Sequence, residues 1–224
     1  MSTMHLPRLK KDNSLSQAVY QAISKEIARG KLRAGDKITE IGISQAMGIS
    51  RAPVREALKR LAQEHLITLT PRSGCHVADM APDEIEEIYD IRVKLECMAL
   101  EKALGRFKVE KIQLFKEKFE ELHNVATRRQ AEKEIDLDAQ LHDMIAQVSG
   151  LKNVQRMLKS LWARTQLIRL REAERGYLPV DACKEHVSLL IAILKSDKRA
   201  AVKLLREHIE HTKKTVLEHL NNPG

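Results

Sequence analysis

The chain has 224 residues, of which 43% are hydrophobic and only 3% aromatic, so it can hold two small domains or one large one around an aliphatic core. Three cysteines without a C-x-x-C pair argue against a disulfide framework and for a reducing compartment. The sequence opens without a signal-like apolar run, and no stretch approaches the roughly 18 apolar residues of a membrane helix. We therefore expect a cytoplasmic protein that makes no contact with a membrane.

The basic excess of the chain is concentrated near its N-terminus. Residues 1–80 hold 13 Lys and Arg against 7 Asp and Glu, whereas residues 81–224 hold 26 against 24. This distribution suggests a module that binds a polyanion, joined to a near-neutral module. A solvated surface without a partner is the alternative.

Two helices are predicted first. Residues 13–30 have apolar residues four apart, with Asn13 or Ser14 as the cap and Gly30 as the stop. Residues 32–38 read as a turn. A short helix follows over 39–48, which Thr39 can cap and a glycine can end.

The stretch "GISRAPVREALKRL" predicts a third helix with a basic face. Ser50 is a suitable N-cap whose hydroxyl can accept a first-turn N–H, and Pro53 falls in the first turn, where no intrahelical bond is lost. Arg51, Arg55 and Lys59 are spaced i, i+4 and i+8 from the helix start, which is where a recognition helix presents side chains to the major groove. The alternative is that these arginines form solvent-exposed ion pairs.

The period of the sequence then changes to that of strands. Apolar and threonine residues alternate over 67–70, "PRSG" is a tight turn, and "CHVA" can return as the partner strand. The pattern predicts a hairpin wing with Arg72 and His76 at or near its tip, suited to contacting phosphate or the minor groove.

These segments together resemble a known family. "GKLRAGDKITE" followed by "GISRAPVREALKRLAQEHLITLTPRSGCHV" is similar to the winged helix-turn-helix of the GntR family of bacterial transcription regulators. The resemblance implies DNA contacts by Arg51 and Arg55 and puts the wing glycine of the family at Gly74. A basic residue that some members carry at the start of the second helix is replaced here by Glu40 and Ile41. The candidate DNA-binding residues are Ser50, Arg51, Pro53, Arg55, Lys59, Arg72, Gly74 and His76.

The remainder of the chain predicts an all-α bundle, so we expect two domains, residues 1–79 and 80–224, and a mainly α fold. No strand-like alternation follows residue 80, and Gly150, the "GYLP" turn and "KSD" separate helical segments. Six helices are expected near 82–105, 108–129, 131–149, 152–173, 180–195 and 197–220.

Four residues of this bundle are candidate metal ligands. Asp138 and His142 are four apart, so they leave the same side of one helix, and they border an apolar stripe. His186 and His208 share the phase of apolar residues on two later helices. Three imidazoles and one carboxylate suit a divalent transition metal, whereas a lone inward histidine is more often a hydrogen-bonded core residue.

The spacing of the four residues resembles a second pattern. D-x3-H, a histidine 44 residues on and another 22 further on are similar to the FCD domain, the ligand-binding bundle of the FadR-like branch of the family. In its metal-bearing members these positions are ligands, which implies a metal at Asp138, His142, His186 and His208, with Zn, Ni, Mn and Fe as candidates.

Arg92 is the main candidate for binding an effector. It lies within an apolar stripe, and a buried guanidinium must find an anion. Its partner is either Glu96 or another internal acid, or the carboxylate of a bound small molecule. "IRVKLE" also resembles the opening of the FCD domain, where this arginine commonly faces the ligand pocket. Arg164, Arg169 and Arg171 are weaker candidates, of which one or two can face inward, and we retain Arg164.

Together these features predict a transcription regulator, and we expect a repressor. It would bind double-stranded operator DNA as a homodimer and respond to a small organic acid at the metal site. One alternative is a metal-dependent hydrolase with a basic N-terminal arm, although Asp143 and Glu185, which adjoin the ligands, point off at roughly 100° on their helices. Another is a DNA-binding dimer whose bundle is only structural.

Overall fold

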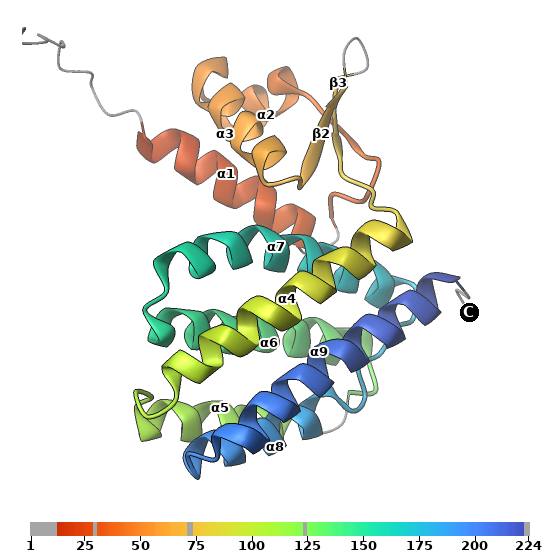
Figure 1. Cartoon of the computed structure of the whole chain (residues 1–224). Coiled ribbons are helices and arrows are strands. Elements are labelled where there is room, and N and C mark those ends of the chain that lie inside the picture. The colour runs from red at the N-terminus through yellow and green to blue at the C-terminus, as the bar shows by residue number, and fades with distance from the viewer. Residues whose placement is uncertain (1–12, 29–30, 71–73, 123–124, 222–224) are drawn as a thin grey trace, which may run out of the picture.

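The N-terminal part of the protein is a winged helix-turn-helix. The computed structural model describes residues 13–28, 31–70, 74–122 and 125–221 (Figure 1). The sheet is antiparallel in the order β1-β3-β2. The elements are α1 (Asn13–Ala28), β1 (Lys37–Ile38), α2 (Glu40–Met47), α3 (Arg51–Gln63), β2 (Ile67–Thr70) and β3 (Gly74–Val77).

The helices and the hairpin confirm the predicted fold class, but two local expectations differ. Residues 32–38 do not form only a turn, because Lys37 and Ile38 pair with β3 as a third strand. Two residues are too few to show a period in a sequence. Ser50 occupies the N-cap of α3, yet its side chain makes no capping bond to any described residue. The start of α3 rests instead on the buried Pro53 and Val54.

The start and the end of α2 agree with the sequence. The hydroxyl of Thr39 accepts a hydrogen bond of 3.0 Å from the N–H of Gly42, and Gly48 ends the helix with a left-handed φ of 64°. Thr39 thus fixes the start of α2, and Gly48 begins the turn that leads into α3.

The C-terminal part is a bundle of six helices in the portion of the chain that the structure describes. The predicted second helix of the bundle is shorter than expected, ending at Glu121 and not near 129. The reason is a new helix start at Thr127, whose hydroxyl accepts a 3.3 Å hydrogen bond from the N–H of Gln130. The helices are α4 (Pro82–Ala103), α5 (Val109–Glu121), α6 (Arg128–Ser149), α7 (Lys152–Glu174), α8 (Ala182–Leu194) and α9 (Lys198–Asn221).

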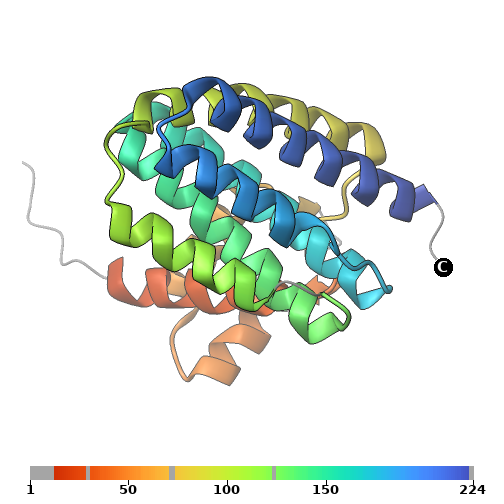
Figure 2. The same cartoon turned by 90° about the horizontal axis from the view of Figure 1, so that it is seen from below.

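The packing of the bundle buries α6 at its centre. α6 contacts α4, α5, α7 and α8, while α4 and α9 run side by side (Figure 2). A polar residue on the inner face of α6 is therefore surrounded by helices and must find partners among them. Among the described helices, none has both the length and the apolar character needed to cross a membrane.

The N-terminal part rests on α7. α1 packs against α7, and the Arg33 guanidinium lies 3.5 Å from the carboxylate of Glu174 at the end of that helix. Arg171 donates a 2.5 Å hydrogen bond to Asp79 in the segment that joins β3 to α4. α7 is thus the bundle helix that touches both the N-terminal part and the connecting segment.

Candidate functional site

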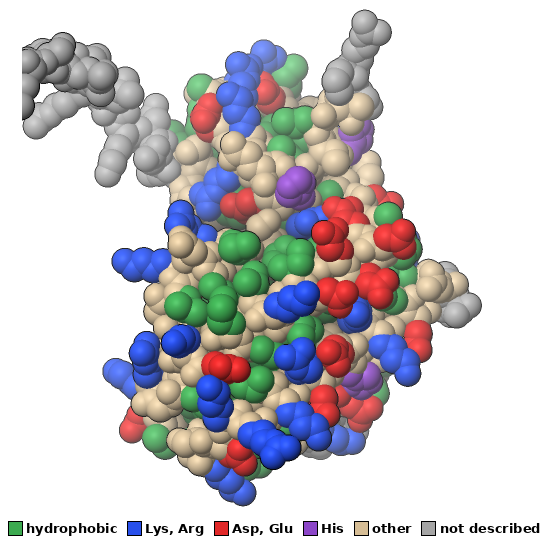
Figure 3. All heavy atoms as spheres, in the orientation of Figure 1, with side chains coloured by type: hydrophobic (Ala, Val, Ile, Leu, Met, Phe, Trp, Pro, Cys, Tyr) green, Lys and Arg blue, Asp and Glu red, His purple; other side chains and the backbone are tan. Residues whose placement is uncertain are grey.

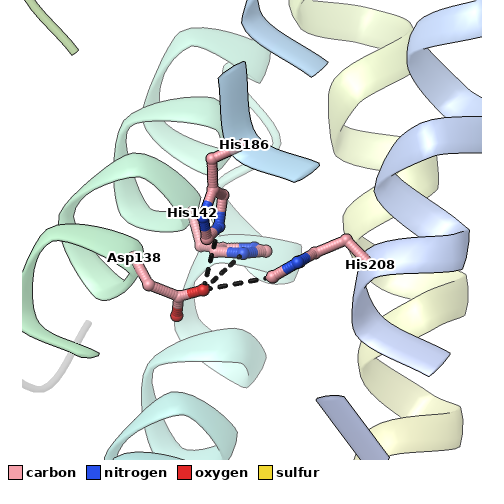
Figure 4. Close-up of side chains that lie close together, drawn as sticks. All are labelled: Asp138, His142, His186 and His208. Carbon is pink, nitrogen blue, oxygen red and sulfur yellow. Dashed lines mark hydrogen bonds and ion pairs between the residues drawn. The ribbon is translucent and has the colours of Figure 1, made fainter. Parts of the chain in front are cut away.

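Four buried side chains converge in the centre of the bundle. Asp138 and His142 come from α6, His186 from α8 and His208 from α9, and each is at most 4% exposed. One potential ligand atom from each residue lies within 4.8 Å of the other three. The candidate ligands chosen from sequence spacing are therefore neighbours in space (Figure 4).

One oxygen of Asp138 faces all three imidazoles. Its Oδ1 atom lies 3.1 Å from Nε2 of His186, 3.1 Å from Nε2 of His208 and 3.4 Å from Nε2 of His142. The same ring nitrogen of each histidine thus points to one place. Three nitrogens and one oxygen around a common point are the donor set of a transition-metal site.

The opposite nitrogen of each histidine faces a glutamate. The Nδ1–H of His142 donates to Glu96, and Nδ1 of His208 lies 2.8 Å from Oε2 of Glu185. Nδ1 of His186 lies 3.7 Å from Oε1 of Glu134. A carboxylate behind a ligating histidine fixes the ring and directs the other nitrogen to the metal.

These three glutamates were not predicted as partners of the histidines. Glu134 precedes Asp138 by four residues and so shares its helix face, which is a signal that the sequence carries. Glu185 was expected to point away from the site. It does so relative to His186 on its own helix, but it reaches His208 on the neighbouring α9, a contact that helical phase alone does not predict.

Arg169 on α7 completes the buried network. Its Nη1 donates to Oδ2 of Asp138 at 2.7 Å and its Nη2 donates to Oε2 of Glu134 at 2.7 Å. Burial lowers the pKa of the guanidinium, but the Asp138 and Glu134 carboxylates outweigh this effect and raise it. Of the three candidate arginines on this helix, Arg169 and not Arg164 is therefore the one that contacts the site.

The network sets unusual protonation states. Burial raises the pKa of Asp138, but Arg169 and His142 outweigh it and hold that pKa well below its ordinary value. Burial lowers the pKa of His142, yet Glu96 and Asp138 raise it to about 9. For His186, burial and the neighbouring His208 lower the pKa to about 3. His186 is thus neutral at physiological pH, the form in which imidazole binds a metal.

The residues of the cluster fit a divalent metal ion. Nε2 of His142 and Nε2 of His186 are buried and have no hydrogen-bond partner within the described ranges. A buried polar atom without a hydrogen bond is costly, and a cation at the common point would bind both nitrogens once His142 has given up its second proton.

The two effector candidates have internal partners. Arg92 donates from Nε to Oε1 of Glu96 at 2.7 Å and from Nη1 to Thr165 at 3.3 Å. Of the two partners that the sequence allowed, an internal acid or the carboxylate of a ligand, the structure thus shows the internal acid. Because Glu96 also contacts His142, Arg92 is one residue removed from the cluster. Arg164 donates to Glu84 at the start of α4.

The candidate DNA-binding residues line one side of the winged domain. A groove of about 690 Å³ runs between α2, α3 and the wing, and its lining includes Arg51, Arg55, Lys59 and Gly74. Gly74 has a φ of 100°, which glycine adopts without strain where the chain turns into β3. The groove thus collects three of the four basic residues of α3, since Arg60 turns to Gln17 and Tyr20 of α1.

Three of the DNA-binding candidates differ from expectation in their placement, and a fourth is not placed. Pro53 is buried, so it supports the first turn of α3 and does not face solvent. His76 is half-buried in the central strand, two residues inside the wing. Arg72 lies outside the described residues. Arg55 forms an ion pair with Glu40, which is the alternative that the sequence left open.

A further surface feature lies on the bundle. Figure 3 shows apolar side chains gathered over α4 and α7, with charged residues around them. Met98 is 44% exposed and Met157 is 56% exposed, and half-buried residues accompany them. The outward apolar side chains of the two helices are Ile91, Leu95, Met98, Met157 and Leu161.

Comparisons with known proteins agree with this architecture. The family model "Bacterial regulatory proteins, gntR family" matches residues 15–77, and the model "FCD domain" matches residues 87–211. The HTH-type transcriptional repressor RspR of Escherichia coli is 21% identical over 209 residues, covering 93% of this chain and 92% of RspR.

Two solved structures share the fold. E. coli McbR/YncC superposes with a TM-score of 0.80 at 22% identity, covering 93% of this chain and 99% of that one. The zinc-bound FCD domain of TM0439 gives a TM-score of 0.50 at 23% identity, covering 64% of this chain and 98% of that domain.

These matches decide between the alternatives that the sequence left open. The matched N-terminal model describes regulatory proteins, which argues against a metal-dependent hydrolase with a basic arm. The second model covers more than half of the chain and coincides with the bundle that holds the Asp138 cluster. The chain therefore belongs to the GntR family of bacterial transcriptional regulators, in the FadR-like branch that carries a C-terminal FCD domain.

Proposed function

We propose that the protein is a metal-containing repressor whose affinity for operator DNA is controlled by a small organic acid. The observation that carries this proposal is the buried convergence of Asp138, His142, His186 and His208 in a chain whose other end exposes a basic helix. Residues 1–79 would bind DNA and residues 80–224 would bind the metal and the effector. The similar RspR is a transcriptional repressor, which supports the sign of the regulation.

DNA recognition would rest on the exposed edge of α3. Arg51, Arg55 and Lys59 lie on successive turns from the helix start and face the open groove. A recognition helix enters the major groove with its N-terminal residues against the bases, and arginine can bond O6 and N7 of a guanine together. Gly74 and the wing would contact the backbone beside it.

The metal would be held by Asp138 Oδ1 and the Nε2 atoms of the three histidines. Zn, Ni, Mn and Fe are compatible with this donor set, and the similarity to the zinc-bound FCD domain of TM0439 favours zinc. When bound, such an ion supplies a Lewis-acidic centre to which a carboxylate or hydroxyl of a small acid can bind. Glu96, Glu134 and Glu185 would orient the histidines.

The effector would be small. A cavity of about 90 Å³ next to the cluster is lined by Glu185, the partner of His208, and by His211 and Thr212. That volume is several times what a single buried water needs, so it suits an acid of a few carbon atoms. Neither Arg92 nor Arg164 lines this cavity, so the acid would have to extend past the metal to bring its far carboxylate to Arg92. Arg92 would then share its guanidinium between that carboxylate and Glu96, and Arg164 is a weaker candidate for the same role.

The apolar face of α4 and α7 would join two copies of the chain. Met98 of α4 and Met157 of α7 are exposed. An exposed apolar patch bordered by charges, as Figure 3 shows over these helices, is typical of an association surface. A second copy is the occupant that fits a regulator, because two reading helices at a fixed spacing recognise two operator half-sites.

The effector signal would pass through α7. This helix holds Asp138 through Arg169, the connecting segment through Arg171 and the N-terminal part through Glu174. A ligand that favours one placement of α7 would change the spacing of the two recognition helices. The change in DNA affinity would be limited to the difference in ligand affinity between the two arrangements.

The test uses the full chain, purified without a histidine tag, and a duplex selected from a random pool. Duplex affinity is measured for the zinc-loaded chain with a panel of two- to six-carbon mono- and dicarboxylates, and for the chelated chain as a comparison. We expect at least one acid to lower the affinity of the metal-loaded chain and to have no effect on the chelated chain. If every acid leaves both forms unchanged, the proposed control by an organic acid at the metal is wrong.

A further inference from the structure

In the groove beside α3, the acid Glu40 contacts Arg55, one of the residues proposed to recognise DNA bases. Arg55 donates from Nε to Oε1 of Glu40 at 2.9 Å and from Nη2 to Oε2 of Glu40 at 3.0 Å. Both side chains reach solvent, since Arg55 is 55% exposed and Glu40 is 31% exposed. The pair therefore lies on the surface of the groove and is not part of the core.

The geometry of the pair decides which edge of the guanidinium remains available. A guanidinium has two edges that can form two parallel hydrogen bonds, one with Nε and Nη2 and one with Nη1 and Nη2. Glu40 occupies the edge that carries Nε. The other edge, with Nη1 and Nη2 at the end of the side chain, is directed away from Glu40. Its two N–H groups match O6 and N7 of a guanine, so we call it the end-on edge.

The charge of Glu40 opposes simple attraction to DNA. The hydrogen bond from Arg55, together with the charges of Arg51 and Lys59, lowers the pKa of the Glu40 carboxyl, so this acid is ionised wherever a duplex is stable. It sits among Arg51, Arg55 and Lys59 and is repelled by the phosphates of DNA. A carboxylate in that place lowers affinity for any duplex, and this cost suits a role in selecting one sequence.

We propose that Glu40 is a specificity-determining positioning residue, which holds Arg55 side-on so that its end-on edge reads a guanine and does not pair with a phosphate. The inference rests on the proposed function only in requiring that α3 enters the major groove. It concerns the first residue of α2, which contacts Arg55 across 15 positions of sequence.

The test compares base preferences of five forms of the full, zinc-loaded chain. Four of them are the natural sequence, Glu40→Gln, Arg55→Ala and the control Glu56→Gln. Glu56 is an exposed acid of α3 that lies 3.6 Å from Lys59, so the control removes the same charge near the same face. Glu40→Ala is a second variant, because the amide oxygen of glutamine could still accept one hydrogen bond from Arg55. Each form binds a set of duplexes that differ from the selected site at one base pair.

We expect Glu40→Gln and Glu40→Ala to lower the preference for guanine, by about tenfold, at the one position where Arg55→Ala also loses it. Both should bind random-sequence duplexes more tightly, with a salt dependence steeper by about 0.9, as expected if the freed Arg55 contacts one more phosphate. Glu56→Gln should keep the full base preference.

Two results separate the inference from the proposed function. If the Glu40 variants bind all duplexes more tightly by one common factor, with base preferences unchanged, Glu40 only neutralises charge and the inference is wrong. If Arg55→Ala leaves the base preference unchanged at every position, the assignment of Arg55 as a reading residue fails, whatever Glu40 does.

Discussion

Arg169 donates a 2.7 Å hydrogen bond to Oδ2 of Asp138, while Oδ1 of the same carboxylate faces the three histidines. One oxygen of this buried acid therefore contacts the guanidinium, and the other contacts the histidines. This relationship leaves Oδ1 as the oxygen available to a metal, and it ties the site to α7.

The first prediction concerns Arg169. Arg169→Met should lower the free energy of unfolding of the chelated protein by about 3–5 kcal/mol, because Asp138 and Glu134 lose their buried counterion. Zinc affinity should fall about 10–100-fold, as expected for a group that orients a ligand. Urea unfolding and competition with a chelating dye measure the two quantities. The control is Arg199→Met, at an exposed position, and equal stability of the two variants would count against the described network.

The second prediction tests the ligand set. His142→Ala should abolish stoichiometric zinc, because it removes one of four donors and leaves Glu96 without its imidazole partner. The matched control is His65→Asn, which removes an exposed imidazole at a left-handed position that asparagine tolerates. Elemental analysis of untagged protein gives the zinc content per chain. Full occupancy in His142→Ala would show that the ligands are others.

The third prediction uses Trp162, the single tryptophan of the chain. Its Nε1–H donates at 2.9 Å to Oε1 of Glu96, and the other oxygen of Glu96 contacts His142. Adding zinc to chelated protein should therefore change tryptophan fluorescence in step with metal binding. At a free zinc concentration 100 times the dissociation constant, stability should rise by about 2.7 kcal/mol, or about 5–10 °C in Tm. An unchanged Tm at saturating zinc would contradict binding at this cluster.

The fourth prediction concerns base reading by α3. Arg55→Ala should weaken binding to the selected operator by about 1–3 kcal/mol and relax specificity at one base pair, while the fold stays intact because the side chain is exposed. Lys59→Ala should instead weaken binding to all duplexes about equally. Fluorescence anisotropy at several salt concentrations distinguishes the two patterns.

The fifth prediction concerns the effector. Arg92→Lys should lower the affinity for the carboxylate that controls DNA binding by at least about tenfold, since lysine cannot pair both oxygens of a carboxylate. The zinc content should stay unchanged. Lysine is chosen over alanine because Glu96 would otherwise lose its buried counterion. Equal effector affinity in this variant would remove Arg92 from the effector site.

Much of this architecture is predictable because its signals are local. Helix periodicity and the glycines at 48 and 150 locate the helices, and the spacing from Asp138 to His208 identifies four residues that do meet in space. Helical phase predicts that a side chain points inward. It does not predict how deep the side chain lies or which helix supplies its partner.

The residues that sequence reasoning missed follow from that limit. Helical phase puts Arg164 and Arg169 on different faces of α7 but does not tell which face meets the cluster, and the packing of α7 against α6 puts Arg169 on Asp138. Glu185 reaches a histidine of another helix. The early end of α5 depends on the cap at Thr127, and β1 is visible only through its pairing with β3.

The central claim is that one regulator combines operator recognition, dimerisation and a metal centre. Native mass spectrometry of the untagged, zinc-loaded chain with its selected duplex tests all three in one spectrum. We predict a species of two chains, two divalent ions and one duplex. A complex that contains a single chain per duplex, or that binds the duplex fully with no ion at either cluster after zinc loading, would contradict the account.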